Sequence, residues 1–95
     1  MHYYSGWIAM HYYGVLWVMC FSRIPEHRRR LGAAIRKRRL ALALSQEQLA
    51  EVVDCHRNYV GNVERGEQNI TMDMLTRFCT ALHCRHSELV RDAGL

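Results

Sequence analysis

Residues Leu44–Gly66 read LSQEQLAEVVDCHRNYVGNVERG, and this stretch decides the fold. It predicts two short helices joined by a tight turn at residues 54–56. Ser45 begins the first helix, because a serine hydroxyl accepts a hydrogen bond from a backbone N–H that a new helix leaves unpaired. Gln48, three residues later, completes a weak capping box. The apolar residues that follow share one helix face: Leu49, Ala50 and Val53.

The second helix is expected from about Arg57 to Arg65, and Gly66 ends it as a left-handed C-terminal cap. Its inward side chains are Val60, Val63 and part of Tyr59. Its outward face carries donors, two asparagine amides and no acid: Arg57, Asn58, Gly61, Asn62 and Arg65. Arginine pairs bidentately with guanine and asparagine with adenine across the major groove. A short helix of this kind, behind another helix and a tight turn, is typical of a helix-turn-helix recognition helix.

Beyond this stretch, Leu31–Leu89 resembles the Cro/C1-type (Xre-like) helix-turn-helix family, which includes phage repressors, restriction–modification controller proteins and many antitoxins. The match covers about 60 of the 95 residues. The motifs that carry it are Leu31-Gly32, Ile35-Arg36, Arg39, Leu44-Ser45-Gln46-Glu47, Leu49-Ala50, Tyr59-Val60, Val63-Glu64-Arg65-Gly66, Asn69-Ile70, Leu75, Ala81-Leu82 and Glu88-Leu89. The segment from His56 to Thr71 looks most like the controllers.

The resemblance implies an all-α, five-helix, lambda-repressor-like domain that binds double-stranded DNA as a homodimer. It also implies that Arg39 pairs with Glu64 and pins the first helix to the recognition helix; a surface arginine or a phosphate contact is the alternative. Contacts to bases are expected from Arg57, Asn58 and Asn62, with Gly61 allowing close approach. Contacts to the DNA backbone are expected from Arg36, Gln46, protonated His56, Arg65 and Asn69.

Gln46 has an independent argument, because a helix N-terminus offers partial positive charge and unpaired N–H groups to a phosphate. The alternative is a plain first-turn residue. Charge is also unevenly distributed: residues 23–39 hold eight of the thirteen basic residues and one acid, although the net charge is only +4. Such a run fits a solvated helix face, but beside a recognition helix it favours phosphate binding.

The four cysteines form no CxxC pair, so we expect reduced thiols used as small apolar residues. Cys79 and His83 share a helix face, yet the family pattern places Cys79 in the core, and no metal or other cofactor is expected. The histidines at 27, 56 and 86 are expected to be surface residues. No catalytic triad, carboxylate pair or phosphate-binding glycine loop is visible, so we expect no enzyme.

Residues 1–24 are expected to form an apolar, aromatic extension, separate from a DNA-binding domain at 25–95. Seven of the nine aromatic residues lie in this extension, and its longest apolar run, Trp7–Phe21, is shorter than a membrane-spanning helix requires. It has no signal-peptide pattern. Three interpretations stay open: sequence translated from a misassigned start, a dimer contact, or a short anchor. Membrane contact is not expected, and a cytoplasmic location is.

The remaining helices are expected at Pro25–Leu42, at Met72–His83 after a Thr71 cap, and from about His86 to Asp92. Their expected core residues are Leu31, Ala34, Ile35, Leu75, Phe78, Cys79, Leu82 and Leu89. Alanine at 43 and histidine at 83 stand where the family usually has glycine. Leu40 and Leu42 are more apolar than the charged residues usual at these family positions, and they are candidates to pack on the N-terminal extension.

These observations together predict a transcriptional regulator. A controller role is favoured, and a phage-type repressor remains open. Two alternatives also remain: an antitoxin-like protein-interaction module and a membrane-tethered regulator.

Overall fold

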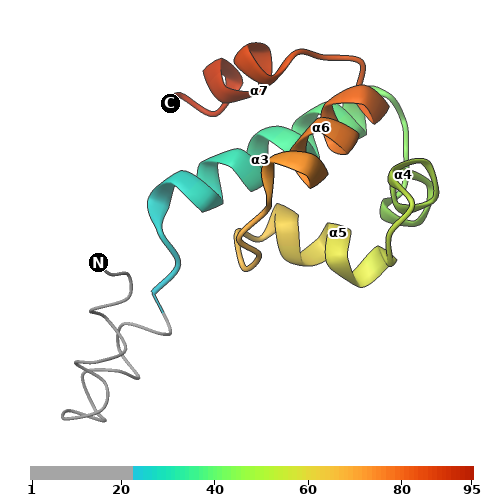
Figure 1. Ribbon diagram of the computed structural model, residues 1–95, viewed down its shortest axis with the longest axis horizontal. Coiled ribbons are helices and arrows are strands. Elements are labelled where there is room, and N and C mark those ends of the chain that lie inside the picture. Colours follow the sequence, from blue (N-terminus) through green and yellow to red (C-terminus); the bar gives the residue numbers. More distant parts are fainter. Residues whose placement is uncertain (1–22) are drawn as a thin grey trace, which may run out of the picture.

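The computed structural model describes residues 23–95, and all its regular elements there are helices (Figure 1). Their bounds are α3 at Glu26–Ala41, α4 at Gln46–Val53, α5 at Arg57–Glu64, α6 at Met72–Ala81 and α7 at His86–Asp92. The predicted all-α, five-helix architecture is therefore confirmed, with helix ends within two residues of expectation. The predictions for residues 1–22, including their use as a dimer contact or anchor, lie outside the described residues.

Local capping explains where the helices begin. The Ser45 hydroxyl accepts from the Gln48 N–H at 3.0 Å, and the Gln48 side chain accepts from the Ser45 N–H at 2.8 Å, so the capping box is complete. Thr71 accepts from the Met74 N–H at the start of α6. These bonds satisfy backbone donors that the first helical turn leaves unpaired.

The helices pack around one core, with α3 between α5 and α7 (Figure 1). Every helix contributes a large, fully buried side chain: Ile35, Leu49, Val53, Val60, Phe78 and Leu89. Tyr59 is half-buried and tilts against Phe78, with ring centroids 6.3 Å apart. The expected core stripe of α6 is likewise buried, including Cys79. Burial in this core raises the pKa of the Cys79 thiol to about 11.

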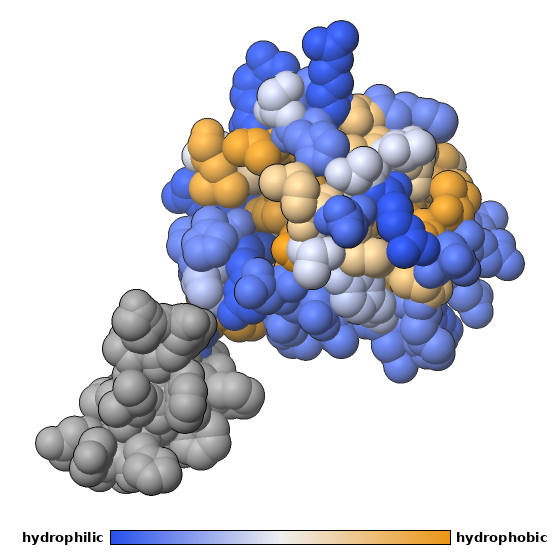
Figure 2. All heavy atoms as spheres, in the orientation of Figure 1, coloured by the Kyte–Doolittle hydropathy of each residue, from blue (hydrophilic) through white to orange (hydrophobic). Residues whose placement is uncertain are grey.

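The surface is mainly polar, with separated hydrophobic patches on the face that Figure 2 shows. The exposed large apolar side chains are Leu40, Leu42, Val52, Met72 and Leu95. No helix within residues 23–95 is long and apolar enough to cross a membrane. In the same part of the chain, no group of three His, Cys, Asp or Glu residues is placed to hold a metal ion.

Three helices are followed by residues with left-handed backbone although none is glycine: Ala43 (φ 58°), Asp54 (φ 66°) and His83 (φ 56°). For Ala43 and His83 this resolves what the sequence left open. The left-handed conformation at Ala43 lets the chain pair two carbonyl groups at the end of α3. The N–H of Ala43 donates to Leu40 O, and the N–H of Leu44 donates to Arg39 O. A side chain with a Cβ makes this conformation costlier than it is for glycine.

We expect Ala43→Gly to raise the free energy of unfolding by about 0.5–1 kcal/mol, because relief of left-handed strain exceeds the extra entropy of glycine in the unfolded chain. Urea denaturation followed by circular dichroism measures it. The matched control is Ala33→Gly at an exposed site inside α3, where a loss of about 1 kcal/mol is expected. Equal losses in both variants would contradict the strain argument.

Candidate nucleic-acid interface

The outward face of α5 and the first residue of α4 enclose a polar hollow of about 510 Å³. We call this the polar hollow; its lining residues are Gln46, Arg57, Asn58, Gly61, Asn62 and Arg65. The structure thus brings together all four residues expected to read bases and two of those expected to contact the DNA backbone. These six residues come from the two elements that the helix-turn-helix pattern predicted.

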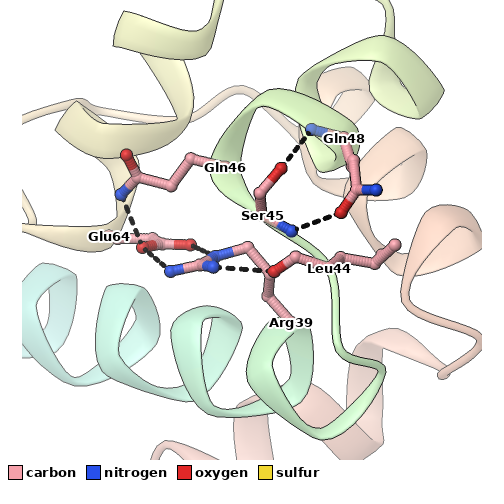
Figure 3. A network of polar contacts seen from close by, with 6 residues as sticks. All are labelled: Arg39, Leu44, Ser45, Gln46, Gln48 and Glu64. Atoms are coloured by element: carbon pink, nitrogen blue, oxygen red, sulfur yellow. Dashed lines mark hydrogen bonds and ion pairs between the residues drawn. The ribbon is translucent and has the colours of Figure 1, made fainter.

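A buried ion pair between α3 and α5 lies behind the hollow and links it to the start of α4 (Figure 3). The Arg39 guanidinium donates to both Glu64 carboxylate oxygens, at 2.6 Å from Nε and 3.1 Å from Nη2. Its Nη1 also donates to Leu44 O at 2.8 Å. The two side chains are only 8% and 3% exposed, so the pair lies inside the domain, as the family resemblance implied.

The same pair positions Gln46, whose amide donates to Glu64 Oε1 at 3.0 Å (Figure 3). Glu64 therefore accepts from α3 and α4 while belonging to α5. This network fixes the N-terminus of α4 relative to the recognition helix α5. Gln46 consequently lines the hollow with its side chain oriented by Glu64.

Along α5, the lining residues differ in exposure. Arg57 and Asn58 are exposed, Asn62 is half-buried, and Gly61 is buried. A Cβ added at Gly61 would lie 3.1 Å from Arg65 Nη1 and 3.7 Å from Gln46 Oε1. Gly61 was expected to let DNA approach closely, but here the ends of two flexible side chains cover it. They would have to move before a base edge could reach the backbone.

Arg65 crosses the hollow and is held on both sides. Its Nη2 donates to Asn62 Oδ1 at 2.5 Å, and its Nε donates to Glu67 Oε2 at 3.1 Å. A second bond joins Nη2 to Glu67 Oε1 at 3.3 Å. Sequence reasoning found no acid on the outward face of α5, and it missed Glu67 because this residue lies past the Gly66 turn.

A second acid, Glu47, approaches from α4, with its Oε2 3.9 Å from Arg57 Nη1. Both side chains are more than 60% exposed, so water screens this contact strongly. The sequence could have indicated both acids by their positions. Glu67 comes directly after the Gly66 turn that ends the recognition helix, and Glu47 lies in the first turn of the preceding helix. Both arginines remain exposed, but Arg57 has only this long contact, whereas Arg65 is hydrogen-bonded to Asn62 and Glu67.

The structure also changes the expectation for His56, which caps α5. Its ring Nδ1 accepts from the Asn58 N–H at 3.0 Å, so this nitrogen carries no proton when it caps the helix. A phosphate contact was expected from the protonated ring. The geometry instead leaves Nε2–H of the neutral ring as the donor, because protonation of Nδ1 would remove the cap.

Arg36, His56 and Asn69 lie outside the polar hollow, and all three are exposed. Arg36 lies one helical turn beyond Gly32, the residue of α3 that packs on the C-terminal end of α5. Asn69 lies on the wall of a small pocket of about 180 Å³ that also includes His27 and Arg28.

The Arg39–Glu64 pair gives a direct test of this arrangement. We expect Arg39→Met to lower the free energy of unfolding by about 3–5 kcal/mol, because the Glu64 carboxylate would stay buried without its counter-charge. The matched control is Arg38→Met, which breaks the more exposed pair with Asp92 and should cost at most about 1 kcal/mol.

Chemical denaturation of both variants measures the difference. If Arg39→Met unfolds no more easily than Arg38→Met, the buried pair does not hold the helices as described.

Known proteins share both the sequence pattern and the fold. A family model described as Helix-turn-helix matches residues 35–89. The control protein C.SmaI of Serratia marcescens is 40% identical over 77 residues, which are 81% of this chain and 88% of that relative.

Two solved structures resemble the fold closely. The restriction–modification controller protein C.AhdI from Aeromonas hydrophila has a TM-score of 0.63 and 39% identity, over 64% of this chain and 92% of that one. The clp gene regulator ClgR from C. glutamicum has a TM-score of 0.72 and 27% identity, over 77% of this chain and 94% of that one.

Proposed function

This chain belongs to the Cro/C1-type helix-turn-helix family and is a DNA-binding transcriptional regulator, and we propose that it recognises a specific double-stranded site as a homodimer. Family membership confirms the resemblance first seen over Leu31–Leu89. The relatives named as control or controller proteins support the same role here, control of a restriction–modification operon. We assign it no enzymatic activity and a cytoplasmic location.

The observation that carries the proposal is the polar hollow, in which α5 presents donors and amides beside the N-terminus of α4. Arg57 and Asn58 are exposed members of the hollow that begin the helix. Side chains at the N-terminal end of a recognition helix reach base edges when the helix lies in the major groove. Arg57 would then read guanine and Asn58 adenine, with Asn62 as a third contact further along α5.

Backbone contacts would set the position of α5 on the duplex. Gln46 and the N-terminus of α4 offer one phosphate site, where the helix dipole adds partial positive charge. Asn69 and the neutral Nε2–H of His56 offer others, and Arg36 adds positive charge. Arg65 adds its charge from the polar hollow, where it is bonded to Glu67. Because such contacts do not depend on base identity, they supply affinity and salt dependence and leave discrimination to α5.

A homodimer would place two copies of α5 about one DNA turn apart, roughly 34 Å, on a near-palindromic site. The last helix is a candidate for the contact between copies. Val90 is half-buried and Leu95 is 53% exposed there, which leaves apolar surface for a second copy to cover.

The experiment is selection of bound sequences from random duplex DNA with the full chain, at two salt concentrations. We expect enrichment of a two-fold-related site by the wild type and its loss in the Arg57→Ala, Asn58→Ala double variant. Each lost base contact should cost about 1–3 kcal/mol of discrimination. Lys37→Ala is the control, because it removes a positive charge beside α7 instead of α5.

Binding without enrichment, or no binding at either salt concentration, would overturn sequence-specific recognition. The first result would leave a non-specific DNA-binding protein. The second would favour a protein partner, as in the antitoxin-like alternative.

A further inference from the structure

Glu67 is an acid placed against the surface that should receive DNA. Gly66 has a left-handed backbone (φ 79°), and the N–H of Glu67 donates to Asn62 O at 2.9 Å. This turn directs the chain back along α5, so that the Glu67 carboxylate meets Arg65 through two bonds of 3.1 and 3.3 Å. A carboxylate in this place repels phosphate, which is unfavourable for a protein that only needs to bind DNA tightly.

The held Arg65 in turn changes what Asn62 and Gly61 present. Asn62 Oδ1 accepts from Arg65 Nη2, and this bond orients the Asn62 amide while occupying one of the two lone pairs of its oxygen. Bidentate recognition of adenine by asparagine needs both the oxygen and the nitrogen, so the orientation that Arg65 gives this amide bears directly on base reading. The same guanidinium lies over Gly61. The Arg65 side chain therefore contacts Asn62 and covers Gly61, and Glu67 holds Arg65 in this position.

We propose that Glu67 is a specificity-determining residue that acts through Arg65. It keeps the Arg65 guanidinium across the polar hollow, where the guanidinium orients Asn62, and away from the DNA backbone. Without the carboxylate charge, Arg65 is a long, mobile cation that binds phosphate at any sequence. Glu67 thus lowers affinity for random DNA more than affinity for the correct site. The inference rests on the proposed DNA-binding function.

The test compares Glu67→Gln with wild type for binding to random duplex DNA and to the selected site, across a range of salt concentrations. We expect affinity for random DNA to rise about two- to fivefold, the factor that an exposed ion pair supplies. Its log–log salt slope should steepen by about one released ion. The preference for the selected site over random DNA should fall by about the same two- to fivefold.

Two controls separate this effect from a general loss of negative charge. Glu51→Gln removes an exposed carboxylate of α4 that, within residues 23–95, forms no ion pair with a residue of the hollow, and it should change affinity for random DNA less than Glu67→Gln does. In an Arg65→Ala background, Glu67→Gln should change that affinity by less than about 1.5-fold, because no guanidinium remains to be released. An effect of equal size with and without Arg65, or one that Glu51→Gln matches, overturns the inference.

A readout without DNA distinguishes this inference from the proposed function. In the free protein, the Arg65 Nε–H resonance should be protected from exchange with water in the wild type and lose that protection in Glu67→Gln. If wild type binds no DNA, the proposed function fails whatever the resonance shows. If wild type selects a site and Glu67→Gln changes neither the resonance nor the affinity for random DNA, only the inference fails.

Discussion

The buried ion pair between Arg39 and Glu64 is the interaction on which the arrangement of the polar hollow depends (Figure 3). A buried pair adds little net stability, because desolvation of both charges offsets their attraction, whereas loss of one partner is costly. Its effect is therefore mainly one of placement. The bonds to Leu44 O and from Gln46 extend it from α3 to the start of α4, so one cluster orients three helices.

Close packing of α3 on α5 makes this pair possible. A Cβ at Gly32 would lie 2.3 Å from Val63 O and 2.5 Å from Glu64 O, so only glycine allows the two helices to approach this closely. Gly66 also packs closely on α3, because its Cβ would meet Arg29 backbone atoms at 2.9 Å. Two glycines therefore bring Glu64 within bidentate reach of Arg39, and the same contact sets the turn that directs Glu67 back toward Arg65.

The fold could be predicted because its determinants are local. The hydroxyls of Ser45 and Thr71 and the conformation of Gly66 fix helix ends within a few residues of sequence, and the apolar spacing fixes the buried faces. The arrangement of side chains in the polar hollow could not be predicted in the same way. The cover over Gly61 depends on which rotamer Arg65 adopts, and that depends on Glu67 beyond a turn. For His56, the sequence predicted its place at the start of the recognition helix, but only the bond from the Asn58 N–H shows that Nδ1 is the acceptor.

The residues of the polar hollow consequently fall into two groups with different energetics. Arg57 and Asn58 face water, so a base contact replaces hydrogen bonds to solvent. Gln46, Asn62 and Arg65 are already bonded to protein groups, so DNA gains only the difference between the new bond and the one it replaces. Discrimination should therefore come mainly from the first turn of α5, while the second group adds shape and orientation. This division follows from the network around Glu64 and Glu67, because those two carboxylates hold the second group before DNA arrives.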